Sequence, residues 1–467
     1  MPADNRDYFP VVHELFTGAQ RSIDVIIYQG RFYFQYPLSR SNALIADLVD
    51  ASERGVKVRA ILEEAEWNFE NSEDNRDVWN VLSQAGVATY FDPLGTTSHS
   101  KLVVVDGEYT VMGSMNWSYY ALDQNNEATV VVESPQIAKQ FEAYFEKLLQ
   151  ASSTAYGLPE RYVKASEALA SKSRLIFVKD VADSGRYLPE AKQGLLYMGG
   201  VTVTVDEDAL EEILAVDSLF FAEVARDTVR VFGAVEKGTG HRLHALDLKT
   251  SSTLPAMAKA FGVERLRLKT MSVPKPVLTW VDASRVVPIP NDKYVPAVTN
   301  LIRSAKQRVW VAMLDARYYE TRPVPAERDK RRPKDAPPSL TNVILDDLMA
   351  AARRGVDVQV VCDMGRGTNP PNSKLAFMKK LQDAGGKVFW DSPEVTMHAK
   401  LLIVDDDFAV VGSTNWTQPA VEDNNETAVL VESPEINQHY AGFIASAKGQ
   451  ACDLRPIGGG AGGLPSP

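Results

Sequence analysis

The sequence predicts an α/β protein in which two homologous layered domains form one unit with pseudo-twofold symmetry, with an α+β insert between them. The first observation is a collinear internal repeat: Asn5–Gln29 returns as Asn291–Asp315, and His99–Trp117 returns as His398–Trp416. The second is that each copy alternates short apolar runs with helical patterns, which is typical of layered α/β domains. The third is a composition of 45% hydrophobic and 24% charged residues, the mixture of a globular chain.

The two copies set the expected domain boundaries. A Pro- and Arg-rich insertion at 320–339 accounts for the larger offset of the later repeated segments. We expect a first layered domain at 1–152, a middle α+β domain of unassigned role at 153–284, a second layered domain at 285–455 and a flexible tail at 456–467. The tail is rich in Gly and Pro, a composition that does not support a packed core.

Each copy is expected to open with a buried strand, because both contain a short apolar run rich in β-branched residues. A helix ending in Arg-Gly follows, where the glycine can adopt the left-handed cap, then a second strand, a second helix and a third strand. Two strands carrying the polar motif come next, and a closing helix starts after Glu-Ser-Pro. The first strands are expected at 23–28 and 309–314, and the helices that end in Arg-Gly at 41–54 and 341–354. The second strands are expected at 56–62 and 356–362, and the second helices at 75–85 and 373–384. The closing helices start after 133–135 and 432–434. In the middle segment the pattern predicts strands at 201–205, 227–236 and 242–248 and a helix at 207–215.

Charge and cysteine content exclude several classes of protein. The chain has 50 Lys and Arg against 61 Asp and Glu, a net charge of −11, so its long-range field repels a polyanion. Cys362 and Cys452 are too few for a disulfide scaffold or a cysteine-built zinc site. No apolar run is long enough to span a membrane, and the polar N-terminal segment does not have the pattern of a signal peptide. We therefore expect a cytoplasmic or peripheral membrane protein, or a secreted one if a leader has been removed.

Both copies carry the same spacing of polar residues. The first reads His99-Ser100-Lys101, four residues, Asp106, six residues, then Gly113-Ser114-Met115-Asn116. The second reads His398-Ala399-Lys400, four residues, Asp405, six residues, then Gly412-Ser413-Thr414-Asn415. Eleven residues past each asparagine stands a glutamate, Glu127 or Glu426. This pattern resembles the phospholipase D superfamily, whose mark is His-x-Lys-x4-Asp followed by Gly-Ser-x-Asn, and both copies are intact.

The spacing also predicts a chemical arrangement. Residues at i and i+2 on a strand share one face, so His99 and Lys101 point together, as do Ser114 and Asn116 on the following strand. The second half repeats this patch, and pseudo-twofold symmetry would bring the two patches face to face. The expected catalytic residues are His99, Lys101, Asn116, Glu127, His398, Lys400, Asn415 and Glu426, with Ser114 and Ser413 as substrate-binding residues.

A facing pair of histidines suits displacement at phosphorus. One attacks and forms a covalent phosphohistidine, while the other protonates the leaving oxygen and then activates the second acceptor. The lysines and asparagines would hold the non-bridging oxygens as charge redistributes. Two ammonium groups can do what a metal does elsewhere, and no metal-binding motif is visible, so we expect neither a metal nor a cofactor.

The resemblance implies individual roles. It assigns His99 as the nucleophile and His398 as the general acid and base. An attacking imidazole must be neutral and needs a partner on its other nitrogen, for which Glu127 and Glu426 are the candidates. Because the acid commonly reaches the histidine of the opposite half in this family, we expect Glu127 to bind His398 and Glu426 to bind His99.

The remaining motif residues are expected to be structural. Asp106 and Asp405 have the opposite parity from the lysines and should form hydrogen bonds at strand ends, while Gly113 and Gly412 belong to the motif backbone. Trp117 and Trp416 should pack behind the site. The other histidines, His13, His241, His244 and His439, are expected to be ordinary surface or core residues.

Three loops leave alternatives open. The aromatic segments 30–34 and 316–319 are either an amphipathic rim that meets lipid or bases, or a packing cluster. The basic segment 322–334 is by default a solvated loop, with anionic headgroups or phosphates as the alternative partner. The acidic segment 63–70 is expected to form a rim that disfavours long nucleic acid. In the middle segment, 219–221 is expected to be core rather than a membrane anchor.

The sequence thus favours a monomeric, metal-independent enzyme resembling phospholipase D, which hydrolyses or transfers phosphodiesters, with phospholipids at a membrane surface as the favoured substrate. The acidic chain and the fusion of both halves favour lipid over nucleic acid. The first alternative is an endonuclease, because the family also contains small nucleases with this signature. The second is a non-catalytic phosphate-binding scaffold, which two intact sets of motif residues argue against.

Overall fold

The computed structural model describes residues 1–33, 38–65, 67–155, 273–319, 339–365 and 372–449, together with short strands between 174 and 236. It divides into two compact units. One contains Ala3–Gln124 and Thr129–Trp280, and the other contains Asn125–Ala128 and Val281–Pro467. The second unit therefore includes four residues of the first repeat. The predicted domain boundaries stay a prediction.

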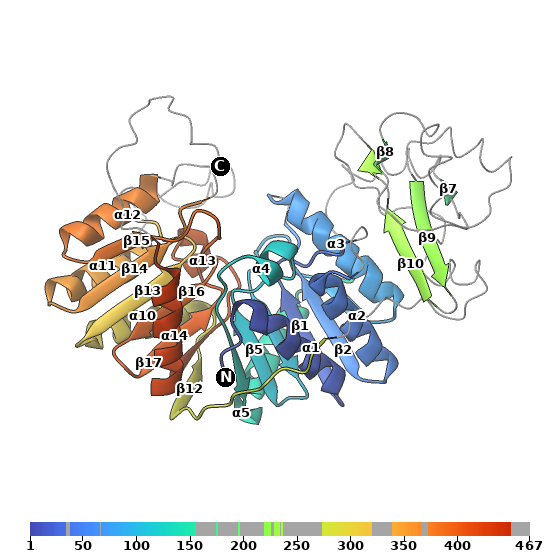
Figure 1. Ribbon diagram of the computed structural model, residues 1–467, viewed down its shortest axis with the longest axis horizontal. Helices are drawn as coiled ribbons and strands as arrows, with labels where there is room; N and C mark the ends of the chain where they lie inside the picture. The colour runs from blue at the N-terminus through green and yellow to red at the C-terminus, as the bar shows by residue number, and fades with distance from the viewer. Residues whose placement is uncertain are drawn as a thin grey trace. The chain divides into compact units, whose positions relative to one another are not determined.

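The first unit is built on a six-stranded mixed sheet (Figure 1). Its order is β3 (Ala88–Phe91), β2 (Lys57–Leu62), β1 (Ser22–Ile27), β4 (Lys101–Val105), β5 (Tyr109–Gly113) and β6 (Thr129–Glu133). Strands β1, β2 and β3 are parallel, whereas β4 runs antiparallel to β1 with Lys101 opposite Ile27. The carboxyl ends of three strands and the start of β4 therefore meet at one edge.

The second unit repeats this sheet and adds one edge strand. Its order is β12 (Arg285–Pro288), β18 (Ala428–Glu432), β17 (Phe408–Gly412), β16 (Lys400–Val404), β13 (Arg308–Met313), β14 (Asp357–Cys362) and β15 (Lys387–Trp390). Again β13, β14 and β15 are parallel and β16 is antiparallel to β13. The predicted fold class of two homologous layered α/β domains is confirmed.

Helices cover both faces of each sheet. In the first unit they are η1 (Asn5–Asp7), α1 (Tyr8–Gly18), α2 (Arg40–Glu53), α3 (Phe69–Gln84), α4 (Tyr119–Asp123) and α5 (Pro135–Leu149). In the second they are η2 (Asn291–Lys293), α10 (Tyr294–Ser304), α11 (Leu340–Arg353), α12 (Asn372–Asp383), α13 (Gln418–Glu422) and α14 (Pro434–Ala447).

Strand alternation assigns each face its helices. On β1, Ile23 and Val25 share one core with residues of α1, α2 and α3. The opposite face of the sheet packs against α5, where the ring of Phe145 lies 4.7 Å from the guanidinium carbon of Arg59 on β2. In the second unit, α10, α11 and α12 share a core with β13, while α14 contacts β13, β16, β17 and β18. Each unit is therefore a three-layer sandwich.

Local signals explain the helix ends. Gly55 and Gly355 follow the first long helix of each unit with φ of +91° and +88°, the left-handed conformation predicted for them. Ser134 caps α5, its side chain accepting from the Ile137 amide, with Pro135 at the first helical position.

Several elements of the two units differ from expectation. Helix α3 begins at Phe69 rather than at residue 75, because the Asn68 side chain accepts the amide of Asn71 and caps the helix there. The paired helices α1 and α10 and the edge strand β12 were not predicted, and β12 is defined only by its pairing with β18.

In the middle segment, β9 (Leu219–Ala225) pairs antiparallel with β10 (Thr228–Gly233) and parallel with β7 (Arg174–Leu175), and β8 (Leu195–Leu196) pairs with β11 (Val235–Glu236). The predicted strand at 227–236 corresponds to β10 and β11. The predicted elements at 201–205, 207–215 and 242–248, the basic segment 322–334 and the tail lie outside the described residues.

Candidate active site

The motif residues of the first half gather at the edge where β1, β2 and β3 end. His99 lies two residues before Lys101, the first residue of β4. Ser114 and Asn116 come just after Gly113, the last residue of β5. The functional side chains therefore extend from strand ends, not from within strands as the sequence suggested. Ligand sites of α/β sheets commonly occupy this edge.

Tyr28 contacts both the histidine and the lysine. Its ring meets the His99 ring edge-on with centroids 4.6 Å apart, and the Nζ atom of Lys101 lies 4.5 Å from the Tyr28 ring centroid. Lys101 Nζ also donates to the backbone oxygen of His99 at 2.6 Å. Ser100 turns the other way, its Oγ lying 3.2 Å from the Tyr144 hydroxyl on α5. His99 and Lys101 therefore lie on one side of the chain, next to Tyr28, and Ser100 lies on the other.

The second unit contains the histidine–carboxylate pair that the sequence predicts. Nδ1 of His398 lies 2.8 Å from Oε2 of Glu127, which is completely buried. The backbone supports this contact, because the Asn126 amide donates to Thr396 O and the His398 amide donates to Asn126 O, both at 2.9 Å. A carboxylate at Nδ1 accepts the proton there and leaves Nε2 as the nitrogen available for chemistry.

Lys400 is buried beside this pair. It is 2% exposed, and its Nζ donates to the backbone oxygen of His398 at 2.6 Å. Burial lowers the pKa of Lys400 to about 8, while the negative charges of Glu127 and Glu426 act in the opposite direction. The side chain is thus a cation at neutral pH that an added anion would stabilise.

Glu426 is held from its own half. Its carboxylate accepts hydrogen bonds from the hydroxyl of Ser413 and, at 3.1 Å, from Nδ2 of Asn424. Asn291 holds the backbone, since its side-chain oxygen accepts the Glu426 amide at 2.8 Å. The expected pairing of Glu426 with His99 stays a prediction. Ser413, assigned to substrate binding from the sequence, is fully buried and serves here as a donor to a carboxylate.

Two amides of the motif retain unused hydrogen-bonding capacity. The Oδ1 atoms of Asn116 and Asn415 are buried and have no hydrogen-bond partner within the described part of the chain. Leaving a buried polar atom unpaired costs about 1–3 kcal/mol, and such atoms are found where a ligand completes the bonding.

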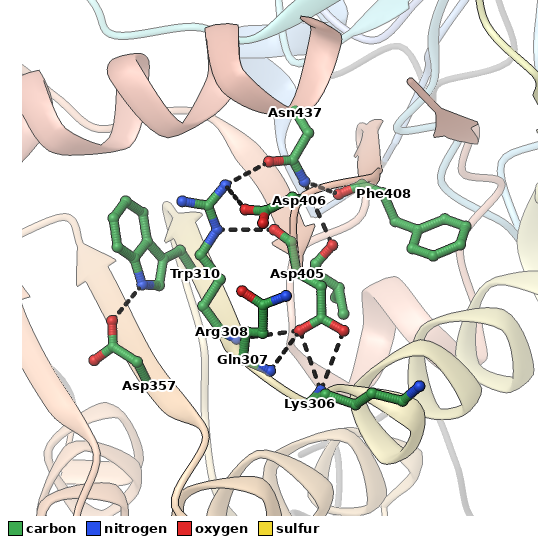
Figure 2. Close-up of polar contacts among 10 residues, drawn as sticks. Lys306, Gln307, Arg308, Trp310, Asp357, Asp405, Asp406, Phe408 and Asn437 are labelled. Atoms are coloured by element: carbon green, nitrogen blue, oxygen red, sulfur yellow. Dashed lines mark hydrogen bonds and ion pairs between the residues drawn. The ribbon is translucent and has the colours of Figure 1, made fainter. Parts of the chain in front are cut away.

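Asp405 has a structural role that Figure 2 shows directly. Its carboxylate accepts the backbone amides of Lys306, Gln307 and Arg308 at 2.8–3.1 Å, and its backbone oxygen accepts Nε of Arg308. The residue has a φ of +48° in the turn after β16. It therefore fastens the start of β13 to the end of β16.

The first half repeats this device. Asp106, with a φ of +56°, accepts the amides of Gln20, Arg21 and Ser22 at 2.7–2.9 Å. In both halves the aspartate of the motif thus lies at the opposite end of its strand from the lysine and bonds to backbone.

Gly412 allows two strands to approach closely. A Cβ atom there would lie 2.5 Å from both the backbone oxygen of Thr427 and the Cβ of Ala428 on β18. Glu426 and Ser413 flank this contact, so the glycine lets β17 and β18 bring them together.

The aromatic residues near the motif mostly pack. Trp117 and Trp416 are buried, and their indole nitrogens donate to the hydroxyls of Tyr8 and Tyr294 at 2.9 and 3.0 Å. In the loop after β1, Phe32 lies in the core of the first unit. For the loops at 30–34 and 316–319 the described residues therefore favour packing over a rim, while Phe34 lies outside them.

The acidic segment after β2 forms an exposed rim only in part, because Glu70 is exposed whereas the first two acids are buried. Glu63 and Glu64 are 0% and 2% exposed, while Glu66 lies outside the described residues. Burial, reinforced by the negative charge of Asp92, raises the pKa of Glu63 to about 8. Burial likewise raises the pKa of Asp92 to about 7.

The second half has matching buried acids, Asp363 after β14 and Asp391 after β15, and burial raises the pKa of Asp391 to about 6. Sequence reasoning did not identify this set of buried acids as candidate functional residues. The available signal was that an acidic residue directly follows the second and third strands in both copies.

Outside the motif, two histidines can be placed. Nδ1 of His13 lies 2.7 Å from Oδ2 of Asp47, and the ring of His439 stacks edge-on against Tyr440. His241 and His244 lie outside the described residues. Across the described ranges, no group of three His, Cys, Asp or Glu side chains is arranged to hold a metal ion, and no helix is long and apolar enough to cross a membrane.

Comparison with known proteins gives a consistent family assignment. The family model described as "Cardiolipin synthase, PLD-like domain" matches residues 12–149 and 298–446, one match in each repeat. Among curated proteins, a mitochondrial cardiolipin hydrolase of Chlamydomonas reinhardtii is 28% identical over 132 residues, 28% of this chain and 52% of that protein. The Xenopus tropicalis protein of the same name is 31% identical over 137 residues, 29% of this chain and 58% of that protein. The chain thus spans about half the length of the curated relatives it matches.

Among solved structures, phosphatidylserine synthase of Haemophilus influenzae Rd KW20 is similar with a TM-score of 0.54 and 9% identity, covering 96% of this chain and 86% of that one. At this identity the similarity concerns the fold alone.

Proposed function

The chain belongs to the phospholipase D-like family, and from this premise we propose that it is a phosphodiesterase that acts on phospholipids through a phosphohistidine intermediate. The observation that carries the proposal is the buried Glu127 carboxylate 2.8 Å from Nδ1 of His398, beside the buried ammonium of Lys400. His13 also has a buried acid on Nδ1, Asp47 at 2.7 Å, so it is the buried lysine beside the acid that distinguishes His398.

The reaction proceeds in two displacements. Nε2 of His99 attacks phosphorus, a P–N bond forms, and the P–O bond to the departing alcohol breaks as His398 donates its Nε2 proton to that oxygen. Water then attacks phosphorus, the P–N bond breaks, and His398 takes the water proton. The products are a phosphomonoester and an alcohol, and an alcohol in place of water gives transfer instead of hydrolysis.

The residues around the reacting phosphate have separate tasks. Glu127 keeps the Nδ1 proton in place and stabilises the imidazolium that forms when Nε2 takes a proton. Lys101 and Lys400 neutralise the non-bridging phosphate oxygens, and Asn116 and Asn415 donate to them from Nδ2, while their buried Oδ1 atoms are left to accept a hydrogen bond from a substrate hydroxyl or a water. We propose that Glu426 does for His99 what Glu127 does for His398.

A phospholipid substrate is supported by charge and by the relatives. A net charge of −11 opposes binding of a long nucleic acid, and both curated relatives described above are named cardiolipin hydrolases. The exposed aromatic residues Trp67, Tyr119 and Tyr120 of the first unit, each about half exposed, suit contact with a lipid–water interface. We propose that a monomer acts there.

The test compares two substrates under one condition. Purified protein is assayed on vesicles of mixed phospholipids containing cardiolipin and, in parallel, on single-stranded DNA, with chelator present throughout. We expect release of headgroup alcohol or phosphatidic acid from vesicles and no cleavage of DNA. Cleavage of DNA alone would make the protein a nuclease, and activity restored only by a divalent ion would overturn the metal-independent mechanism.

Histidine variants then test the roles. His99→Ala and His398→Ala should each lose several orders of magnitude in turnover, because the two groups act as a unit. The matched control His439→Ala, in α14, should keep full activity. Quenching a slow substrate should leave its phosphoryl group, still esterified to the retained alcohol, on His99, and label on His398 would reverse the assignment.

A further inference from the structure

Asp92 connects two loops at the site edge of the first sheet. Its Oδ1 accepts the amide of Glu64 at 2.7 Å and its Oδ2 accepts the amide of Ser98 at 2.9 Å. The residue is 2% exposed and follows β3 directly, with its own amide bonded to Leu62 O at 3.0 Å. Ser98 is the residue before His99, so this carboxylate fixes the backbone that leads into the histidine.

The second half builds the same connection from different neighbours. Oδ1 of Asp391 accepts the amide of Met364 at 2.9 Å, and Oδ2 accepts the amide of Met397 at 2.6 Å. Asp391 is 1% exposed and follows β15, with its amide bonded to Cys362 O at 3.0 Å. Met397 precedes His398. In each unit, an aspartate directly after the third parallel strand thus forms hydrogen bonds to the loop after the second strand and to the residue before the motif histidine.

The chemistry of the bridge requires a carboxylate. Two backbone amides approach from opposite loops, and only a carboxylate offers an acceptor oxygen to each without also presenting a donor. An asparagine would keep one bond and turn an N–H toward the second amide. Burying an acid costs free energy, and the two hydrogen bonds to backbone amides offset that cost.

We propose that Asp92 and Asp391 are positioning residues that set the orientation of His99 and His398 by fixing the backbone of the preceding residue. A displacement of about 1 Å in a reacting group can cost about 100-fold in rate, so a slack loop would reduce turnover without removing any group that touches substrate. The effect on turnover rests on the proposed function, whereas the effect on the histidine rings does not.

The two halves should respond unequally. Met397 has a second acceptor, because Oδ1 of Asp363 lies 3.2 Å from its amide. In the first half the corresponding acid, Glu63, instead accepts from Nδ2 of Asn71 at 2.8 Å. We therefore expect a larger effect at position 92 than at position 391.

The test uses Asp92→Asn and Asp391→Asn in the full chain. We expect kcat on phospholipid vesicles to fall about 10- to 100-fold for Asp92→Asn and less for Asp391→Asn, with KM little changed. The histidine ring resonances, followed by NMR without substrate and assigned with the His→Ala variants, should shift for His99 only in the first variant and for His398 only in the second.

The matched control is Asp47→Asn, the same chemical change at an acid 2% exposed on α2. It should lose stability while keeping kcat and both histidine signals. If an asparagine variant fails to fold, the glutamate variant at that position, which keeps both oxygens one methylene further out, is measured in the same way. Wild-type kcat together with unchanged histidine signals in folded variants overturns the proposal. A wild-type protein inactive on every phosphodiester refutes the proposed function, and the NMR shifts then still decide the positioning role.

Discussion

Glu63 makes the stability of the first unit depend on pH in a predictable direction. The side chain is completely buried; one carboxylate oxygen accepts Nδ2 of Asn71 and the other has no partner among the described residues. Burial, then the charge of Asp92, raises the pKa of Glu63 from 4.5 to about 8. Replacing Glu63 by glutamine gives a neutral side chain of the same shape and removes the titration.

The sign follows from proton counting. Between pH 4.5 and about 8 the folded protein keeps a proton on Glu63 that the unfolded chain has lost, so the free energy of unfolding falls as pH rises through this window. At about 1.4 kcal/mol per pH unit, a shift of this size corresponds to about 5 kcal/mol between the ends of the window. In the Glu63→Gln variant, the free energy of unfolding should change less over this pH window, by about the same amount.

Urea unfolding at pH 5, 6.5 and 8 measures the difference. The wild type should lose stability across the series, and Glu63→Gln should lose much less, with the remaining slope coming from Asp92, whose pKa is raised to about 7. Glu70→Gln, at an exposed position in the first turn of α3, changes the same charge and should parallel the wild type. Parallel curves for Glu63→Gln and wild type would refute the reasoning, because they would mean that Glu63 ionises in the folded protein.

Three further predictions concern the second unit. Because burial lowers the pKa of Lys400 to about 8, kcat/KM should fall as pH rises through about 8. In Lys400→Arg the side chain stays charged, so this fall at alkaline pH should disappear. The same fall in the arginine variant would assign it to another group. Glu127→Gln should keep the fold but cut turnover about 10²–10⁴-fold, as for other orienting carboxylates, and a near-wild-type rate would show that the His398 contact has no catalytic role. Gly412→Ala should cost about 1–3 kcal/mol in urea unfolding, because its Cβ would lie 2.5 Å from Thr427 O, whereas Gly442→Ala in α14, with nothing within 4 Å, should be neutral or slightly stabilising.

The repeat made most of the fold predictable from sequence. Most strands and helices are predicted twice, once from each copy of the pattern, although α1 and α10 are not. The Arg-Gly and Glu-Ser-Pro signals predict helix ends through local chemistry at Gly55 and Ser134. The parity argument also assigned Asp106 and Asp405 to hydrogen bonds at strand ends, where the structure has them. These features depend on residues close together in the chain.

The buried acids were misread because their partners are distant in sequence. Asp92 accepts the amide of Glu64, 28 residues earlier, and no periodicity within either segment indicates that contact. A run of glutamates after a strand is usually solvated, so Glu63 was placed on a rim. Strand β12 was missed for a related reason, since four residues form a strand only because β18 pairs with them.

The four residues Asn125–Ala128, made as part of the first repeat, are completed by the second unit. Glu127 meets His398 across 271 residues of chain. At about 5–20 residues per second of synthesis, roughly 15–55 s separate the appearance of the acid from that of its histidine. Until residue 398 has been made, the Glu127 carboxylate has no His398 imidazole to bind, so under the proposed function a shorter nascent chain should be inactive. A second repeat produced without Asn125–Ala128 would lack the carboxylate that lies 2.8 Å from Nδ1 of His398. The motif occurs twice in the chain, and the segment Asn125–Ala128 makes the second copy depend on four residues of the first.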